Sequence, residues 1–213
     1  MPRPRTLLTV AVTVAVAAAA GAVGFTALFR PPDEPPVYDG DRPQLASSGY
    51  VSRTEEVTIA VRRADFLRWS SDPDRELGDI VKSEGSIPTV EGTEALRGEW
   101  DPEAGRAGDR RRVQFSDGHY LAEEVITDVP GEFTYLIWGF TSAQRLAVRH
   151  GTASFRFEKL DGDTTRVRWT YSLLPTSSVV APFVERYVDD SLAPMMRATL
   201  TGMRDGAEAD LTR

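Results

Sequence analysis

Hydrophobic and polar residues alternate in the second half of the chain, and this alternation predicts strands of a sheet with one buried face. Over 152–160, Ala153, Phe155 and Phe157 occupy alternate positions between polar residues. Over 166–174, the alternating apolar residues are Val167, Trp169, Tyr171 and Leu173. Because successive side chains of a strand point to opposite faces, each segment places its apolar residues on a single face. The segments therefore predict a sheet with one dry side.

Further strands are expected upstream, separated by turn signals at hairpin spacing. The expected strands cover 57–61, 96–100, 111–115, 120–129 and 133–141. Asp117-Gly118 is a strong signal for a tight hairpin between two of them. Two short helices are expected within 66–81, where Ser-Asp-Pro at 71–73 interrupts the apolar pattern. Turns about every ten residues indicate an antiparallel meander.

The C-terminal segment predicts a helix that covers the dry side of this sheet. Apolar residues recur at three- and four-residue steps between Phe183 and Met203, which is the spacing of an amphipathic helix of about 28 residues. Ser177 or Ser178 is the expected N-cap. Pro194 is expected to kink or divide the helix near Ser191, because proline has no backbone N–H to donate to the helix.

The N-terminal region predicts a membrane-spanning helix over 6–29. This stretch carries no charge and is long enough to cross the roughly 30 Å hydrocarbon layer. Arg3 and Arg5 precede it, which favours a cytoplasmic N-terminus over 1–5 and a domain outside the cytoplasm, at the cell membrane. The alternative is a signal peptide cleaved near Ala20-Gly21-Ala22, which would release a secreted domain.

A proline-rich linker is expected between this span and the folded domain. It covers 30–52 and holds Pro31, Pro32, Pro35, Pro36 and Pro43. Such a segment is extended and semi-rigid, so it would act as a spacer. The domain is expected over 53–208, followed by a short tail over 209–213. A domain of this length is large enough for a sizeable core.

Charge and cysteine content narrow the classes of partner and chemistry. The 213 residues include 25 Lys and Arg against 32 Asp and Glu, for a net charge of −7, and the part after residue 30 is more acidic still. This balance argues against nucleic acid as a partner and against broad docking on anionic lipid heads. The absence of cysteine excludes disulfides, thiol nucleophiles and cysteine-based metal sites.

Three stretches carry a family resemblance: GDRRRVQFSDGHYLAEEVI (108–126), FTYLIWG (133–139) and GTASFRFEKLDGDTTRVRWTYSL (151–173). With the order of the expected elements, they resemble the START-like, or SRPBCC, superfamily. Within it, the chain looks most like the bacterial polyketide cyclase/dehydrase and lipid-transport group. One departure is Arg62-Arg63-Ala64-Asp65, where members often carry a Pro-containing stretch. The entrance side of the domain is therefore expected to differ in shape.

The resemblance implies an α+β helix-grip fold, shared with the Bet v 1-like allergens, in which an antiparallel sheet wraps around the long C-terminal helix. Members bind lipids, sterols, polyketides or other apolar molecules in a cavity between them, and some are cyclases or dehydratases. The candidate cavity residues are Phe115, Tyr120, Glu124, Tyr135, Phe155, Phe157, Trp169, Tyr171, Phe183, Tyr187 and Met195. Ordinary core packing is the competing interpretation for each of them.

Two adjacent carboxylates mark the strand over 120–129. Glu123 and Glu124 point to opposite faces, so one of them should face the interior, as a general base or to orient a ligand. The apolar neighbours do not decide which one does: Tyr120 shares a face with Glu124, and Leu121 shares one with Glu123. Glu124 is taken as the candidate cavity residue, and the choice between the two stays open. The alternative is an ion pair with the run 110–112, in which Arg111 could also meet an anionic head group at the cavity mouth.

No cofactor or metal is expected. The two histidines, His119 and His150, are expected at the surface, and no ligand spacing joins them to carboxylates. The chain has no Gly-x-Ser-x-Gly elbow, phosphate loop or dinucleotide fingerprint. The expected function is membrane-anchored binding of an apolar small molecule or lipid. The alternatives are a cyclase or dehydratase that uses a cavity carboxylate, and a protein-interaction module with a collapsed cavity.

Overall fold

The computed structural model describes residues 30–72, 74–75, 77–82 and 87–212. The predicted span over 6–29 and the N-terminal residues 1–5 lie outside these residues. Within the described part of the chain, no helix combines the length and the apolar character needed to cross a membrane. All the strands and helices considered below belong to the compact unit over 32–213.

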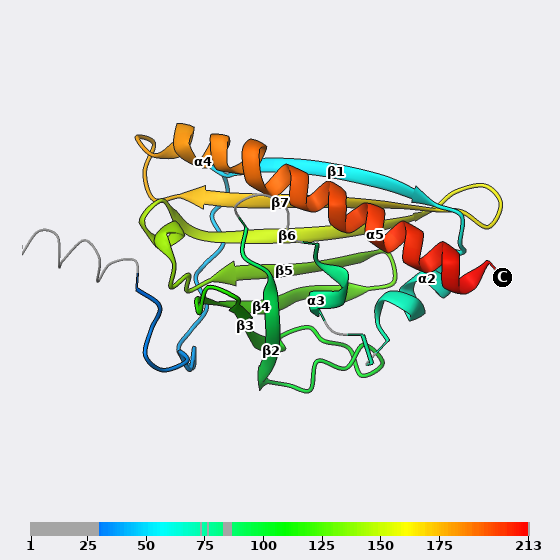
Figure 1. Cartoon of the computed structure of the whole chain (residues 1–213), viewed down its shortest axis with the longest axis horizontal. Coiled ribbons are helices and arrows are strands. Elements are labelled where there is room, and N and C mark those ends of the chain that lie inside the picture. The colour runs from blue at the N-terminus through cyan, green and yellow to red at the C-terminus, as the bar shows by residue number, and fades with distance from the viewer. Residues whose placement is uncertain (1–29, 73, 76, 83–86, 213) are drawn as a thin grey trace, which may run out of the picture. The chain divides into compact units, whose positions relative to one another are not determined.

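Seven antiparallel strands form one sheet in the order β1-β7-β6-β5-β4-β3-β2 (Figure 1). The strands are β1 (Val51–Ile59), β2 (Val90–Arg97), β3 (Arg110–Phe115), β4 (Tyr120–Val129), β5 (Glu132–Trp138), β6 (Val148–Lys159) and β7 (Thr165–Pro175). From β2 to β7 the strands form the predicted meander, and β1 pairs with β7 at the far edge. The predicted antiparallel sheet is confirmed.

Two strands begin well before their predicted positions, and both are edge strands. The sequence predicted strands over 57–61 and 96–100, whereas β1 begins at Val51 and β2 at Val90. Edge strands are poorly marked by apolar alternation because much of their surface stays wet. On β1, the positions facing the helix include Glu55, which pairs with Arg197 on the helix at 2.9 Å.

The helices are α2 (Arg63–Ser70), α3 (Leu77–Ile80), a short 3₁₀ turn η1 (Ala143–Leu146), and a C-terminal helix in three parts: α4 (Ala181–Tyr187), the π-helical turn η2 (Val188–Leu192) and α5 (Ala193–Leu211). Figure 1 shows α4 and α5 lying across one face of the sheet, here called the inner face. The helix buries Val184, Val188, Leu192, Met195, Met196 and Leu200 against it. The predicted covering helix is confirmed, but its N-cap is Val180, which makes no side-chain cap bond, and not Ser177 or Ser178.

Proline determines where this helix changes its hydrogen-bond pattern. The π-helical turn ends two residues before Pro194, as the expected division near Ser191 requires. Proline has no backbone N–H, and its ring collides with the carbonyl four residues earlier, which is that of Asp190. One wider turn removes this conflict, and the helix continues to Leu211.

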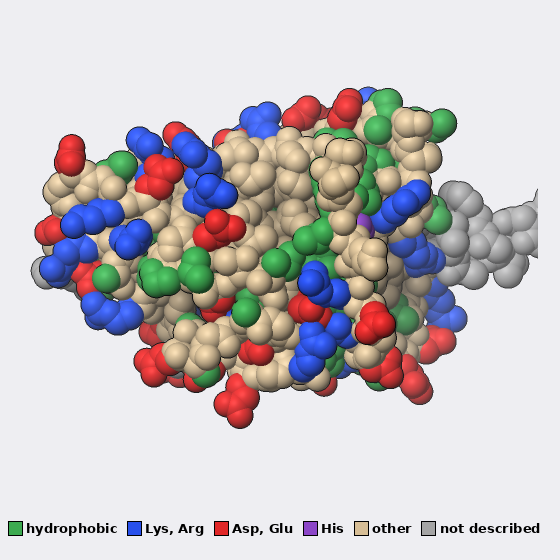
Figure 2. Space-filling view, turned by 180° about the vertical axis from the view of Figure 1, so that it is seen from behind, with side chains coloured by type: hydrophobic (Ala, Val, Ile, Leu, Met, Phe, Trp, Pro, Cys, Tyr) green, Lys and Arg blue, Asp and Glu red, His purple; other side chains and the backbone are tan. Residues whose placement is uncertain are grey.

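The opposite, outer face of the sheet carries a second, smaller apolar cluster. Ala122, Leu136 and Trp138 are buried there, and Tyr38 packs over them. The Tyr38 hydroxyl donates to the backbone carbonyl of Gly139 at 2.7 Å. Figure 2 shows the molecule from the side opposite to Figure 1, with charged side chains of both signs scattered over it.

The segment 36–50, here called the strap, is held to this outer face. Arg110 donates to the carbonyls of Tyr38 and Gly40, and Arg112 donates to the carbonyl of Pro36. At the other end of the strap, the Tyr50 hydroxyl lies 2.8 Å from Nε2 of His150. The sequence predicted an extended spacer over 30–52; most of its residues up to Tyr50 are exposed, and the strap contacts the sheet through these few bonds before β1 begins at Val51.

Candidate functional site

A cavity of about 410 Å³ lies between the inner face of the sheet and the C-terminal helix. Its volume falls within the range of about 300–1,000 Å³ that is typical of small-molecule sites. Its apolar lining residues are Leu77, Val81, Ile87, Pro88, Val90, Val113, Phe115, Leu121, Phe140, Ala143, Val148, Trp169, Leu173, Leu192 and Met195. The polar ones are Asp117, His119, Tyr120, Glu123, Tyr135, Ser142, Gln144, Tyr171 and Tyr187. The predicted partly hollow interior is therefore present.

Two small residues of β6 lie next to large residues of the neighbouring strands on the inner face. Gly151 pairs with Leu173 on β7, and a Cβ atom at Gly151 would lie only 2.7 Å from the side chain of Leu173, so Leu173 covers this glycine. Two positions along, Ala153 pairs with Tyr135 on one side and with Tyr171 on the other. Ala153 thus presents only a methyl group between the two tyrosines.

Of the two adjacent glutamates, Glu123 is the one that lines the cavity wall. Arg111 holds it through Nε at 2.7 Å and through a terminal nitrogen at 2.6 Å, and both contacts end on Oε2. The guanidinium of Arg111 also lies over the ring of Trp100, 4.1 Å from its centre. Within the described residues, no hydrogen bond reaches Oε1 of Glu123. That oxygen is therefore available to accept a hydrogen bond from a ligand.

Glu124 lies on the other side of the sheet, which corrects its prediction as a cavity residue. It is buried on the outer face, where Arg110 binds it through two nitrogens at 2.9 and 2.7 Å. Arg42 of the strap and Arg97 of β2 also reach this carboxylate, at 3.1 and 2.6 Å. The alternative expectation of ion pairs with the run 110–112 is correct for both glutamates.

Two tyrosines place their phenol groups near Glu123. Tyr135 and Tyr171 both line the cavity. Burial raises the pKa of Tyr135 above its ordinary value, and the Glu123 carboxylate raises it further. Burial also raises the pKa of Tyr171, with Tyr135 and Glu123 adding to the effect. Both phenols therefore stay protonated and neutral over the physiological pH range.

Polar residues near the cavity entrance connect loops to the helix. Gln144 on η1 donates from Nε2 to the Tyr187 hydroxyl on α4 at 2.7 Å. His119, after the β3–β4 turn, places Nδ1 at 3.1 Å from the Thr141 hydroxyl. These bonds tie the β5–β6 connection to two neighbouring elements, and so they fix one side of the entrance.

Most of the predicted cavity residues line the cavity. Those that do are Phe115, Tyr120, Tyr135, Trp169, Tyr171, Tyr187 and Met195. Phe155 and Phe157 share the inner face but not the cavity: Phe155 stacks on Trp169, with ring centres 4.7 Å apart, and Phe157 contacts Phe66 of α2. This end of the interior is therefore solid, because α2 fills it.

Phe183 was predicted to oppose these aromatic residues, and the structure shows instead that it is 71% exposed. Its neighbour Val184 takes the buried position on α4. The recurrence of apolar residues at three- and four-residue steps does not choose between two adjacent ones. The helix phase is decided by Val184 and Val188, which reach the core.

Both histidines are buried, which corrects their expected surface position. His119 is 7% exposed, and His150 is 4% exposed within β6. His150 is covered by the strap through Tyr50, which no local sequence pattern indicates. Burial, and then the charge of Arg149, lowers the pKa of His150. No group of three or more acidic or histidine residues among the described part of the chain could hold a metal ion.

Several cavity residues were missed by the sequence analysis. Leu77 and Val81 come from α3 and the residue after it, and Ile87 and Val90 lead into β2. They form a wall that approaches the helix only in the folded chain. Apolar residues in short elements carry little periodic signal, so only their position in space identifies them.

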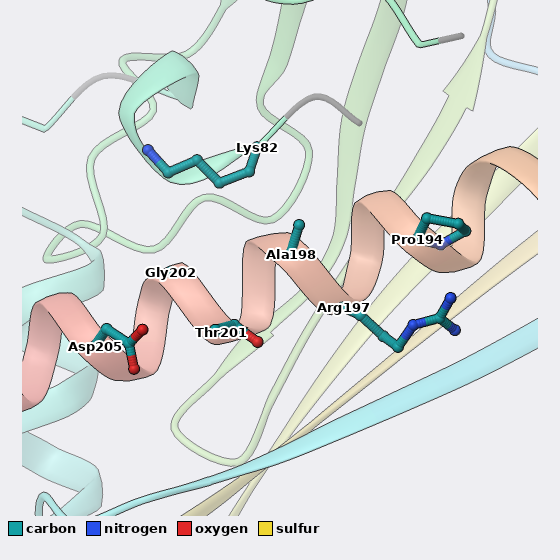
Figure 3. Close-up of a pocket in the computed structure, with 7 residues that line it drawn as sticks. All are labelled: Lys82, Pro194, Arg197, Ala198, Thr201, Gly202 and Asp205. Carbon is teal, nitrogen blue, oxygen red and sulfur yellow. The ribbon is translucent and has the colours of Figure 1, made fainter. Parts of the chain in front are cut away.

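A second hollow lies on the outside of α5 and is less suited to an apolar ligand. Figure 3 shows Lys82 facing the helix residues Ala198, Thr201, Gly202 and Asp205, with Pro194 and Arg197 further along it. This groove of about 550 Å³ opens to solvent, and its lining residues are mostly small or charged. The Lys82 ammonium donates to the carbonyl of Asp79. The internal cavity is therefore the candidate site.

Comparison with known proteins shows the fold. No protein-family model and no curated protein matches the chain. Among solved structures, norcoclaurine synthase from Thalictrum flavum is similar, with a TM-score of 0.56, 14% identity, and coverage of 79% of this chain and 99% of that one. The Zhui aromatase/cyclase from Streptomyces sp. R1128 has a TM-score of 0.55, 15% identity, and coverage of 75% and 94%.

A START superfamily protein from Mycobacterium smegmatis is also similar, with a TM-score of 0.51, 14% identity, and coverage of 74% of this chain and 99% of that one. The seven-stranded antiparallel sheet and the long C-terminal helix fit the Bet v 1/START helix-grip fold. At these identities the likeness establishes architecture, since one fold carries many functions.

Proposed function

We propose that this chain binds an apolar small molecule or lipid in the cavity between sheet and helix. The observation that supports it is a hollow interior lined mainly by aliphatic and aromatic side chains. Each 100 Å² of apolar ligand surface removed from water would contribute about 2.5 kcal/mol. Similar structures include an aromatase/cyclase and a START superfamily protein, which is consistent with small-molecule chemistry in this fold.

The proposal includes attachment to a membrane through the uncharged stretch over 6–29. Its support is the sequence alone, namely its length, its lack of charge and the preceding Arg3 and Arg5. A single-pass anchor would keep the cavity near an apolar reservoir. Retention of the full chain in membranes after an alkaline wash would support this part. Its appearance in the soluble fraction without residues 1–22 would instead favour cleavage after Ala22.

A Met195→Trp substitution should abolish ligand uptake. Met195 is 5% exposed and lines the cavity, so the larger indole would occupy the space that a ligand needs. Wild-type full chain, purified from expressing cells and extracted with organic solvent, should carry an apolar compound that mass spectrometry detects in a fixed ratio to protein.

Met203→Trp is the matched control. Met203 lies on the same helix and packs against the core, but it does not line the cavity. This variant should keep the bound compound. A wild-type chain that carries no apolar compound would overturn the proposed function, and equal retention by both variants would show that the compound binds elsewhere.

An enzyme is the second candidate, and the polar set in the cavity favours it over an interaction module. Glu123 has one carboxylate oxygen free of bonds from the described residues, and the phenol of Tyr135 or Tyr171 is a neutral acid beside it. Glu123 could remove a proton from the carbon next to a ketone, while a phenol donates a hydrogen bond to the developing enolate oxygen. This is the first step of an aldol-type cyclisation.

The expected result is that the full chain speeds the exchange of α-protons of β-tetralone in deuterated water, measured by NMR. Glu123→Gln should lower this rate at least about 100-fold, since an amide is not a base. Glu94→Gln, on the exposed side of β2, should leave it unchanged. No acceleration by the wild-type chain would remove the enzyme candidate and leave the binding function in place.

A further inference from the structure

Two hydroxyl groups in the cavity lack partners. Tyr135 and Tyr171 line the cavity, and neither phenol oxygen makes a hydrogen bond with the residues that the structure describes. The third tyrosine of this group, Tyr187, is already bonded to Gln144. Among the described residues, Trp169 Nε1 is the one buried side-chain nitrogen or oxygen without a partner, so the two tyrosine hydroxyls are open to the cavity rather than sealed in the core. A ligand that enters the cavity can therefore bond to both of them.

The sheet places these two side chains at the same level. Tyr135 on β5 and Tyr171 on β7 are both paired with Ala153 on the strand between them. They therefore project from one row of the inner face, about 10 Å apart at the backbone. Since Ala153 carries only a methyl group, nothing on the central strand separates the two rings. A single ligand that lies over Ala153 could contact both phenols.

The charges in the cavity wall disfavour an anionic ligand. Among the described residues that line the cavity, none is a lysine or an arginine. Arg111 does not line the cavity. Two nitrogens of Arg111 bind the Glu123 carboxylate, and the guanidinium of Arg111 also lies over the ring of Trp100. A carboxylate in this space would meet the Glu123 carboxylate without a free cation. The idea that Arg111 binds an anionic head group is therefore not supported by the geometry.

We infer that the ligand is an uncharged apolar molecule with a hydroxyl or keto oxygen, which Tyr135 and Tyr171 hold by hydrogen bonds. This inference rests on the proposed function and goes further by naming the ligand class. Protonated phenols can donate to a ketone or alcohol oxygen, and a ligand hydroxyl can in turn donate to the free oxygen of Glu123. A hydrocarbon leaves these groups unpaired, and a carboxylate adds a like charge beside Glu123.

The test compares three probes of one size: β-methylnaphthalene, β-naphthol and β-naphthoate. Their binding to the full chain in phosphatidylcholine nanodiscs is measured by calorimetry near neutral pH, with empty nanodiscs as the blank. β-Naphthol should bind about tenfold more tightly than β-methylnaphthalene, which is the effect of one or two net hydrogen bonds. β-Naphthoate should bind more weakly than both.

The double variant Tyr135→Phe/Tyr171→Phe should remove the advantage of β-naphthol and leave β-methylnaphthalene within about twofold of its wild-type affinity. Tyr50→Phe is the control and should keep the advantage of β-naphthol, since Tyr50 lies on the strap and does not line the cavity. If β-methylnaphthalene binds as tightly as β-naphthol, or β-naphthoate binds most tightly, the inference is wrong while the proposed function stands. If none of the three probes binds, the proposed function fails with it.

Discussion

An Arg110→Met variant should lose about 3 kcal/mol of the free energy of unfolding. Arg110 is 4% exposed, and it neutralises Glu124, which is 5% exposed. Removing one partner of a buried ion pair costs about 3–5 kcal/mol, because the remaining charge stays buried without compensation. We expect the lower end of this range, since Arg42 and Arg97 also reach Glu124 from the surface.

The loss should appear as a fall in the midpoint of thermal unfolding of roughly 6–12 °C, followed by circular dichroism. The variant should also loosen the strap, because Arg110 donates to the carbonyls of Tyr38 and Gly40. Faster amide hydrogen exchange in β4 and β5, beneath the strap, would report this loosening.

Arg112→Met is the matched control for this prediction. Arg112 lies on the same strand and face, but its carboxylate partner, Glu94, is 63% exposed at the side chain. Exposed ion pairs contribute about 1 kcal/mol or less, so this variant should unfold within a few degrees of the wild type. If both variants lose the same free energy of unfolding, the burial of the Arg110–Glu124 pair does not make its loss more costly, and the prediction is wrong.

Phe66→Ala should be the most destabilising substitution considered, with a loss of about 3–5 kcal/mol in urea unfolding. Phe66 is fully buried, and its ring contacts both Trp69 and Phe157 at the solid end of the interior. Removing it leaves a cavity, and Arg63 at the start of α2 ties the helix to the carbonyl of Phe157, which opposes a collapse of α2 into the space. Under conditions where the variant is folded, probe binding in the ligand cavity should persist.

Phe183→Ala makes the same chemical change at an exposed position. Phe183 is 71% exposed on α4, so its truncation should change the free energy of unfolding by no more than about 0.5 kcal/mol. It should also leave ligand uptake intact, since Phe183 does not line the cavity. A large effect on either quantity would show that α4 rotates and places Phe183 inside.

The two faces of the sheet are covered differently. On the inner face, the sheet and the C-terminal helix enclose a cavity. On the outer face, Tyr38 of the strap packs over a cluster around Trp138 and Leu136, and Arg110 binds both the strap and the buried Glu124.

Local sequence patterns were enough to predict the strands and helices that have one solvent-exposed face and one buried face. Val167, Trp169, Tyr171 and Leu173 alternate with polar residues, so the face they share was predictable without a structure. The division of the C-terminal helix was predictable for a covalent reason, since Pro194 lacks a backbone donor wherever it is placed. The helix-grip architecture was expected from the family resemblance, which rests on the order of the predicted strands and helices and on three sequence stretches.

The tertiary structure alone decided which carboxylate faces the cavity. Residues 121–125 of β4 are all buried, because the strap covers one face and the core the other. Alternation reveals the inner face only when the other face is wet, so Glu123 and Glu124 could not be distinguished. The hollow was likewise decided by the tertiary structure, because its lining residues come from several strands, α3, the β5–β6 connection and the C-terminal helix, which meet only in the folded chain.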